Sequence, residues 1–188
     1  ELKKILQEKG HIFRSKSDTE VIIHLYEENG VDCVKLLTGM FAFAIWDENK
    51  QRLLLARDRV GKKPLNYTIK NGNLIFGSEI KSILQDPDIH PEVNIEALDL
   101  YLTYGYVPAP QTIFLGIKKL PPAHTLIWEK GEIKVQRYWG LSYKNKVKMD
   151  EVECGERILE LLTEATKIRL ISDVPLGIFL SGGIESSI

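Results

Sequence analysis

The chain opens with two segments in which apolar residues recur at the spacing of an α-helix. Residues 1–9 place three aliphatic side chains on one face, and a glycine of the kind that ends helices follows directly. Residues 17–30 repeat the spacing, and Ser17 and Glu20 have the separation of a capping box. The pattern therefore predicts two helices, with a further short helix at 31–37.

The stretch that follows is rich in residues that favour β-strands. Residues 40–47 and 52–58 are predicted to form adjacent strands across a polar turn. The first of these is apolar at nearly every position, which predicts burial on both faces. Residues 65–78 predict a β-hairpin, because Asn71-Gly72 lies at its centre and this pair favours a type I′ turn.

Helical spacing returns at 79–84 and 94–104, before a stretch that contains four of the eight prolines. This stretch, 104–122, predicts a rigid and extended connector, because proline fixes the backbone φ angle. Residues 124–139 predict another hairpin that turns at a Lys-Gly pair.

A polar, lysine-rich stretch at 141–150 predicts a domain boundary. Beyond it, residues 151–170 predict a strongly amphipathic helix, and 175–180 predict an apolar strand that leads into a glycine-rich loop. Helix, strand and glycine-rich loop in this order are typical of the start of an open α/β sheet.

Composition and charge narrow the classes of protein. Of 188 residues, 44% are apolar, which is enough to fill a core, and the net charge of −1 gives no sign of a nucleic-acid or acidic-membrane partner. Neither Cys33 nor Cys154 belongs to a CxxC motif, and the four histidines share no metal-ligand spacing. We therefore expect free thiols in a reducing compartment. The chain begins at Glu1 inside a helical pattern, which predicts a piece of a longer protein.

The last ten residues, FLSGGIESSI, carry the clearest candidate chemistry. Gly182 and Gly183 allow a backbone that approaches a ligand closely, and three nearby serines offer hydroxyl donors for a phosphate. The loop lacks GxxxxGK[ST] and GxGxxG, which excludes a Walker loop and argues against a dinucleotide site. From this local pattern alone, a phosphate loop and an ordinary Gly-Ser turn both remain open.

Two longer stretches together carry a family resemblance. FLSGGIESS resembles the pyrophosphate loop SGGxDSS of the ATP pyrophosphatase fold, and residues 14–67 resemble the central part of a class II glutamine amidotransferase domain. They are joined by YLTYGYVPAPQTIFLGIKKLPPAHTL (101–126) and RYW (137–139). In this order they resemble the glutamine-hydrolysing asparagine synthetases over essentially the whole chain.

The resemblance implies an α+β fold in two parts. Residues 1–145 would form a glutamine amidotransferase domain of type 2 with its connector, as an N-terminal-nucleophile-type αββα sandwich that lacks its N-terminus. Residues 146–188 would begin a truncated synthetase domain, with the first helix and strand of an α/β ATP-pyrophosphatase-type domain.

The resemblance also implies an activity, in which ammonia from glutamine attacks β-aspartyl-AMP to give asparagine, AMP and pyrophosphate. ATP and Mg²⁺ would serve as cofactors, and glutamine, aspartate and ATP as substrates, in a cytoplasmic enzyme that is a homodimer at full length. No nucleic-acid or membrane partner is implied. Two alternatives stay open: a related amidotransferase that acts on another carboxylate, as in cell-surface polysaccharide or β-lactam-type pathways, and a degenerate non-catalytic homologue.

Asp18 matches the family aspartate that receives the α-amino group of glutamine. From the residues alone, Asp18 is better explained as an acidic complement to a helix N-terminus. The family nucleophile is an N-terminal cysteine, so the resemblance places no catalytic residue within 1–188. The signature ARDRVGKKPL (56–65) is assigned no catalytic role, and we expect its charges to hold a turn and an interface.

Seven residues match the ATP and pyrophosphate loop of the family: Leu180, Ser181, Gly182, Gly183, Glu185, Ser186 and Ser187. Glu185 is also assigned to Mg²⁺, although the family has aspartate there. Its extra methylene moves the carboxylate, and Mg²⁺ demands near-ideal octahedral geometry. We therefore expect the loop to bind phosphate and to handle metal or pyrophosphate less well.

Overall fold

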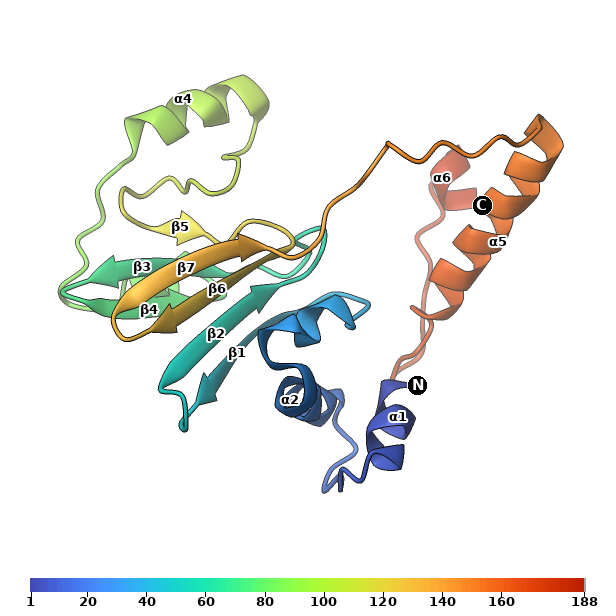
Figure 1. Cartoon of the computed structure of the whole chain (residues 1–188). Coiled ribbons are helices and arrows are strands. Elements are labelled where there is room, and N and C mark those ends of the chain that lie inside the picture. The colour runs from blue at the N-terminus through green and yellow to red at the C-terminus, as the bar shows by residue number, and fades with distance from the viewer. Residues whose placement is uncertain (188) are drawn as a thin grey trace. The chain divides into compact units, whose positions relative to one another are not determined.

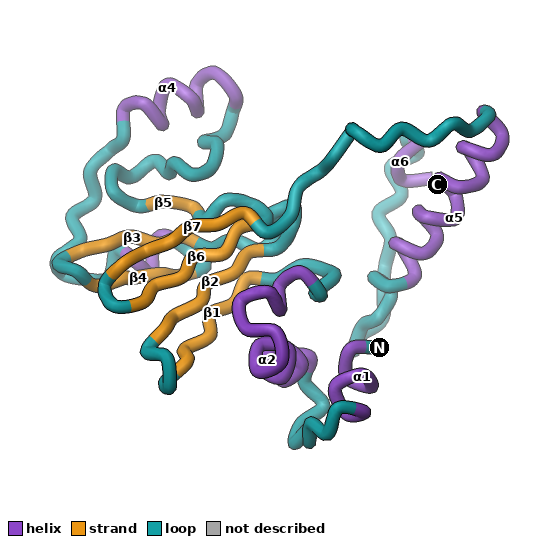
Figure 2. Tube along the Cα trace, in the orientation of Figure 1, coloured by secondary structure: helices purple, strands orange, loops and turns teal. Residues whose placement is uncertain are grey.

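The computed structural model describes residues 1–187, with the backbone alone at Glu185 (Figure 1). The chain divides into two compact units, Glu1–Leu141 and Ser142–Ile188. The first unit contains two antiparallel sheets and the second contains helices and loop, as the colouring of Figure 2 shows.

Three helices open the first unit: α1 (Leu2–Glu8), α2 (Asp18–Asn29) and the 3₁₀ helix η1 (Gly30–Lys35). They confirm the predicted N-terminal helices. The capping box, however, is wrong. The Ser17 hydroxyl caps α2 by accepting the N–H of Thr19 at 3.2 Å, whereas the Glu20 carboxylate turns away to the backbone of the preceding loop.

The larger sheet has the strand order β1-β2-β6-β7, and its pairs are antiparallel. Its strands are β1 (Ala42–Asp47), β2 (Arg52–Arg57), β6 (His124–Glu129) and β7 (Glu132–Arg137). Both predicted strand pairs are confirmed. β1 lies at an edge and Trp46 is 46% exposed, so the expected burial of β1 on both faces is wrong among the described residues.

The smaller sheet has the order β4-β3-β5, made of β3 (Asn66–Lys70), β4 (Asn73–Gly77) and β5 (Lys118–Lys119). Lys70 pairs with Asn73, which confirms the two-residue hairpin turn at Asn71-Gly72. Short helix α3 (Ile80–Ile83) lies against β3 and β4, and α4 (Ile95–Tyr104) follows.

Alternate residues of β2 connect three layers of the first unit. Leu54 and Ala56 point into a cluster with α1, α2 and η1, whereas Leu55 points into a cluster with Tyr67 of the smaller sheet. All three β2 side chains are fully buried. Because successive side chains of a strand point to opposite faces, β2 packs against the helices on one face and against the smaller sheet on the other. Each fully buried leucine contributes about 2 kcal/mol of transfer free energy to this packing.

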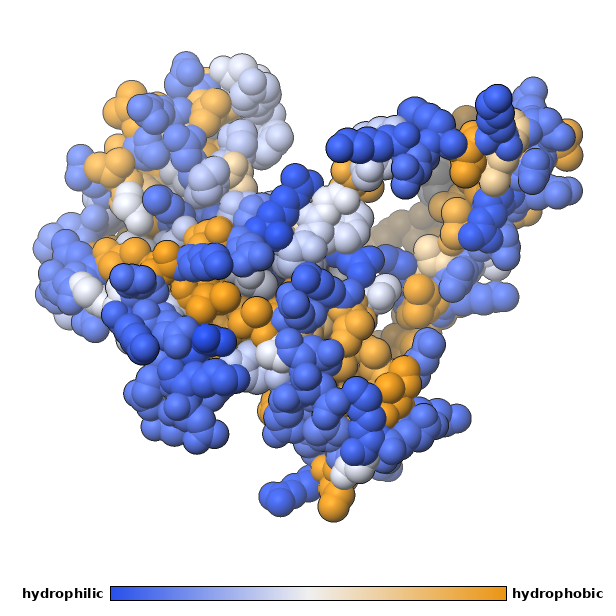
Figure 3. Space-filling model, viewed as in Figure 1, coloured by the Kyte–Doolittle hydropathy of each residue, from blue (hydrophilic) through white to orange (hydrophobic). Residues whose placement is uncertain are grey.

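The second unit holds α5 (Glu151–Lys167) and the short α6 (Ile184–Ser187). The amphipathic helix is confirmed, but none of its residues is buried and its large apolar side chains are exposed, as the orange atoms among blue in Figure 3 illustrate. The strand predicted at 175–180 is absent, and Phe179 there is 99% exposed. A strand needs a hydrogen-bonded neighbour, and the described part of this unit contains no other strand.

Candidate functional site

Asp18 is the first residue of α2, immediately after the Ser17 cap. Its side chain is exposed, and within residues 1–187 it has no hydrogen-bond or ion-pair partner. The cap satisfies the helix end through Ser17, so the Asp18 carboxylate is not engaged in it. The carboxylate therefore lies open to a ligand at the start of a helix.

The loop before Asp18 is fixed by Glu20. The Glu20 carboxylate accepts the N–H groups of Arg14 and Ser15, each at 2.7 Å, and the Ser15 hydroxyl at 2.5 Å. The Arg14 N–H and the Ser15 hydroxyl lower the pKa of Glu20 to about 2. Glu20 is thus ionised at neutral pH and holds the backbone that leads into Asp18.

The signature 56–65 folds around a buried carboxylate. Asp58 is 0% exposed and accepts N–H groups from Val60 at 3.2 Å and from Lys62 and Lys63 at 2.9 Å each. Burial raises the pKa of Asp58, but the N–H donors outweigh it and leave the pKa below its usual range. The expected turn is therefore confirmed.

Arg57 holds the same turn from outside. Its guanidinium donates to the backbone oxygens of Lys63 and Gly61 at 2.8 Å each and of Leu120 at 2.6 Å. The Tyr138 hydroxyl donates to the Arg57 carbonyl at 2.8 Å. These contacts join the turn to the connector and to the end of β7, which is a structural role and not a catalytic one.

The glycine-rich loop of the second unit curls back on itself. Gly182 has a φ of 80°, in the left-handed region that glycine adopts readily. The hydroxyls of Ser181 and Ser186 lie 2.9 Å apart across the turn, and the Ser187 hydroxyl donates to the Gly183 carbonyl at 2.8 Å. Three of the predicted serines thus gather on one short loop.

The family resemblance assigns two further non-glycine residues of this loop, Leu180 and Glu185, to the same site. Leu180 is 72% exposed and directly precedes Ser181. The side chain of Glu185 lies outside the described residues, so the metal role assigned to it stays a prediction. Asp18 belongs to the first unit and the loop to the second.

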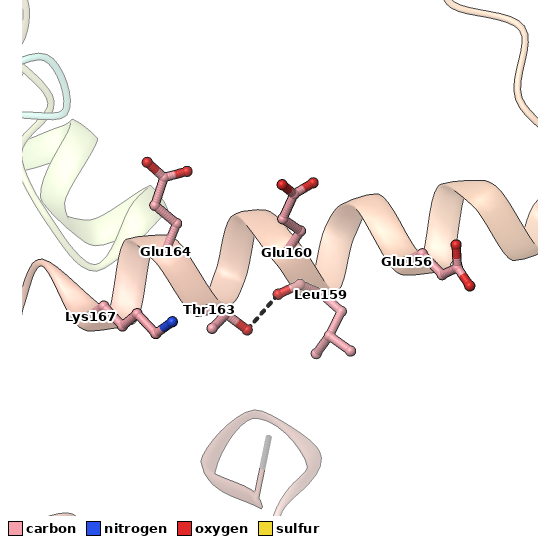
Figure 4. Close-up of a pocket in the computed structure, with 6 residues that line it drawn as sticks. All are labelled: Glu156, Leu159, Glu160, Thr163, Glu164 and Lys167. Carbon is pink, nitrogen blue, oxygen red and sulfur yellow. Dashed lines mark hydrogen bonds between the residues drawn. The ribbon is translucent and has the colours of Figure 1, made fainter.

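An open concavity lies beside α5, and all six residues that line it come from that helix (Figure 4). Its only drawn hydrogen bond runs from the Thr163 hydroxyl to the Leu159 carbonyl at 2.7 Å, within the helix itself. Three of the lining side chains are glutamates, and one of them, Glu160, forms an ion pair with Arg157 of the same helix. We assign no site to this surface.

Both cysteines are free, as expected. Cys33 is buried and burial raises the pKa of its thiol to about 11, which leaves it protonated and unreactive at neutral pH. The sequence spacing gave no reason to expect two histidines close together, but the Nδ1 atoms of His11 and His24 lie 3.1 Å apart. They lie thirteen positions apart in the sequence with a loop between them, so no motif spacing could have indicated the pair.

None of the described helices is both long enough and apolar enough to cross a membrane.

The arrangement of two antiparallel sheets with a helical layer is that of an N-terminal-nucleophile-type amidotransferase domain. A solved structure of the allosteric regulatory enzyme of purine biosynthesis shares this fold with a TM-score of 0.50, at 23% identity over 73% of this chain and 25% of that one. The family model of the glutamine amidotransferase domain matches residues 1–139, and the chain belongs to this family. The model of asparagine synthase matches residues 157–188.

Curated relatives carry two kinds of name. The chain is 44% identical to a glutamine-hydrolysing asparagine synthetase of Bacillus subtilis (strain 168), over 100% of this chain and 30% of that protein. It is 41% identical to an amidase of Gibberella zeae, over 93% of this chain and 26% of that protein. The chain therefore spans less than a third of the length of either relative.

Proposed function

We propose that this chain forms the amidotransferase region and the first part of the synthetase region of an ATP-dependent, glutamine-hydrolysing asparagine synthetase. The order of the two family matches carries the proposal, because the amidotransferase match at 1–139 precedes the asparagine synthase match at 157–188. The 44% identity to the Bacillus subtilis relative runs through both matches.

The proposed reaction joins two chemistries that need each other. A carboxylate is a poor acyl donor, and adenylation of the aspartate side chain with ATP turns it into a good one while releasing pyrophosphate. Ammonia released from glutamine then displaces AMP to form the amide. Transfer inside the protein keeps the ammonia unprotonated and away from bulk water.

Within this scheme, Asp18 binds the α-ammonium group of glutamine. The carboxylate is exposed and has no partner in the described chain, and Glu20 fixes the turn that presents it. An ion pair with an ammonium group is a charge-assisted contact, which is stronger than a neutral hydrogen bond.

The loop 180–187 is the proposed site for the phosphates of ATP. The left-handed backbone at Gly182 and the exposed hydroxyl of Ser181 fit a ligand that approaches the main chain closely. Backbone N–H groups and serine hydroxyls would hold the phosphates, with Leu180 beside the nucleotide and Glu185 at Mg²⁺. The ion would supply positive charge to the phosphate oxygens.

A chimera tests the proposal directly. Residues 1–188 replace the matching part of the Bacillus subtilis relative, and the purified protein is assayed for asparagine with glutamine or with ammonia as nitrogen donor. We expect activity with both donors. A soluble, folded chimera that makes no asparagine with either donor would contradict the proposal.

A variant of the chimera at Asp18 tests whether this residue binds glutamine. We expect Asp18→Asn to raise the KM for glutamine at least about tenfold while ammonia-dependent synthesis stays unchanged. Asp99→Asn, an exposed aspartate on α4, is the matched control and should leave both activities intact. An equal loss of asparagine synthesis with glutamine and with ammonia would contradict a role of Asp18 in glutamine binding.

Glu185→Asp tests the metal role through ATP–pyrophosphate exchange. We expect the variant to exchange faster and to reach half its maximal rate at a lower Mg²⁺ concentration, because the shorter side chain restores the carboxylate position of the family. Equal rates with equal Mg²⁺ dependence would remove Glu185 from the metal site.

A second candidate function is an amidotransferase that acts on another carboxylate, because a relative that matches 93% of this chain carries a name other than asparagine synthetase. The full-length protein distinguishes the two. Asparagine formation from aspartate supports the first, whereas ATP–pyrophosphate exchange that needs a different carboxylic acid supports the second.

From the family we also propose that the full-length enzyme is a cytoplasmic homodimer with small-molecule substrates and without nucleic-acid or membrane partners. The net charge of −1 supports the absence of a polyanionic partner. Sedimentation equilibrium of the full-length protein tests the dimer, and a monomer at micromolar concentration would contradict it.

A further inference from the structure

Three side chains at the junction of α1 and α2 bring ligating atoms together. His24 and Glu27 lie one turn apart on α2, and His11 approaches them from the loop that follows α1. The Nδ1 atoms of the two histidines are 3.1 Å apart, and Glu27 Oε2 lies 2.7 Å from His24 Nδ1 and 3.4 Å from His11 Nδ1.

These distances fit one face of a metal coordination sphere. A tetrahedral ion with bonds of 2.0–2.1 Å separates its ligand atoms by about 3.3 Å. The three separations bracket that value, and the largest change that an ion requires is an opening of the contact between His24 Nδ1 and Glu27 Oε2 by about 0.6 Å, from 2.7 Å. Two imidazole nitrogens and one carboxylate oxygen are a donor set that suits Zn²⁺ and its neighbours among the transition metals.

A second carboxylate orients His11 for this role. His11 Nε2 lies 3.0 Å from Glu28 Oε1. The other carboxylate oxygen of Glu28, Oε2, forms an ion pair with Lys9 Nζ at 2.6 Å, and this ion pair fixes the Glu28 side chain. A proton on Nε2 donates to Glu28 and leaves the lone pair of Nδ1 directed at the cluster. This carboxylate–histidine arrangement is the usual outer shell of a metal-bound histidine.

The surroundings of His24 also favour a bound ion over a neutral pair. If Nδ1 of neutral His24 donates to Glu27, the other nitrogen, Nε2, is a buried lone pair without a hydrogen-bond partner that faces Glu20 Oε1 at 3.9 Å. If Nδ1 instead binds a metal, the proton moves to Nε2 and faces that carboxylate. Glu20, Glu27 and Glu28 together supply negative charge for a cation.

We propose that His11, His24 and Glu27 bind one Zn²⁺-type divalent transition metal ion, with a water molecule in the fourth position. Because His11 lies outside α2 and the other two ligands lie on it, the ion would tie the loop after α1 to α2. It would also fix His24 beside Glu20, the residue that holds the turn before Asp18.

Titration of the metal-stripped 188-residue chain tests the site. Calorimetry with Zn²⁺ should give one ion per chain, and Co²⁺ should give the strong visible absorption of tetrahedral coordination. We expect Glu28→Gln, which only orients His11, to weaken Zn²⁺ binding by about 10-fold, and His24→Gln and Glu27→Gln, which each remove a ligand, to weaken it more than Glu28→Gln does. Bound Zn²⁺ should raise the Tm of the chain and not that of His24→Gln.

Two control variants should leave the titration unchanged. His90→Gln removes an exposed histidine outside the cluster, and Cys154→Ser removes an exposed thiol that is itself a possible zinc ligand. Glu27 is 53% exposed, so its variant is expected to fold, and far-UV circular dichroism checks this. Absence of saturable binding, equal binding by a folded Glu27→Gln variant, or loss of binding in Cys154→Ser would overturn the proposal.

Discussion

Asp58 is a buried charged residue that the surrounding backbone holds in place. Its carboxylate is fully buried and accepts three backbone N–H groups of its own turn, and the Asp58 carbonyl accepts the N–H of Ala123 at 2.9 Å. The sequence marked this turn as a signature, but it could not show that the charge points inward. A solvated carboxylate and a buried one have the same letter in the sequence.

Asp58→Asn should lower the free energy of unfolding by about 1–3 kcal/mol, because an amide nitrogen replaces one acceptor oxygen in front of buried donors. Urea unfolding measures the change, with Asp99→Asn as the exposed control. The folded pKa of Asp58 lies below the unfolded value, so its contribution is present above about pH 4 and is lost as pH falls through the folded pKa. The variant should therefore lose less stability between pH 5 and pH 3, and an unchanged acid dependence would contradict this account.

Gly61 is a second residue whose identity the turn determines. It has a φ of 70°, and a Cβ atom there would lie 2.8 Å from Pro122 Cγ. Gly61→Ala should cost about 1 kcal/mol for the left-handed backbone and about 1–3 kcal/mol more for the overlap. Gly116→Ala is the matched control, because its φ is 79° and nothing lies within 4 Å of the added Cβ. Equal losses in urea unfolding would show that the contact with Pro122 is relieved without cost.

At the scale of elements, local patterns predicted what local forces determine. Both hairpins and α2 form as expected, since turn residues and helical spacing act over a few residues. The burial of β1 and the strand at 175–180 were wrong, because both depend on which elements pack beside them. The capping box was wrong for a related reason, since Glu20 finds better donors in the loop at Arg14 and Ser15.

The start of α2 should respond to pH through Glu20. Its folded pKa is about 2 and its ordinary value is 4.5, so the stabilisation is complete above pH 4.5 and is lost as pH falls toward 2. Glu20→Gln should speed amide hydrogen exchange at Arg14 and Ser15 at neutral pH, because the carboxylate that accepts both N–H groups is gone. Glu8→Gln, on the exposed face of α1, is the control. Unchanged exchange at both amides would show that the turn is stable without the Glu20 carboxylate.

At the scale of the whole molecule, the two candidate sites differ in what the sequence could predict. The loop 180–187 is continuous in the chain, so its Gly-Ser pattern raised a phosphate loop as one of two interpretations, and the family resemblance favoured it. The cluster of His11, His24 and Glu27 is assembled by the packing of one helix beside a loop, and single-sequence spacing contains no record of that approach. The same holds for Asp18, whose local pattern indicated only a helix start and whose proposed role came from the family.

The two units should also differ in resistance to protease. The first buries two clusters of apolar side chains, whereas α5 buries none of its residues and every residue of 141–150 is exposed. Cleavage needs a stretch of backbone to open locally, which costs little where nothing is packed. Brief digestion with trypsin should therefore cut first at the lysines of this stretch and leave a product that begins at Glu1.

Mass spectrometry of a digestion time course identifies the first cuts, which we expect at Lys144, Lys146 and Lys148. Replacing all three by glutamine should slow the appearance of the N-terminal product without changing the far-UV circular dichroism spectrum. The internal control is Lys130, which lies in the exposed turn between β6 and β7 but within a paired hairpin. If Lys130 is cut as fast as the lysines at 144–148, hairpin pairing does not protect the first unit from trypsin. The division of the chain into a stable part and an open part would then be wrong.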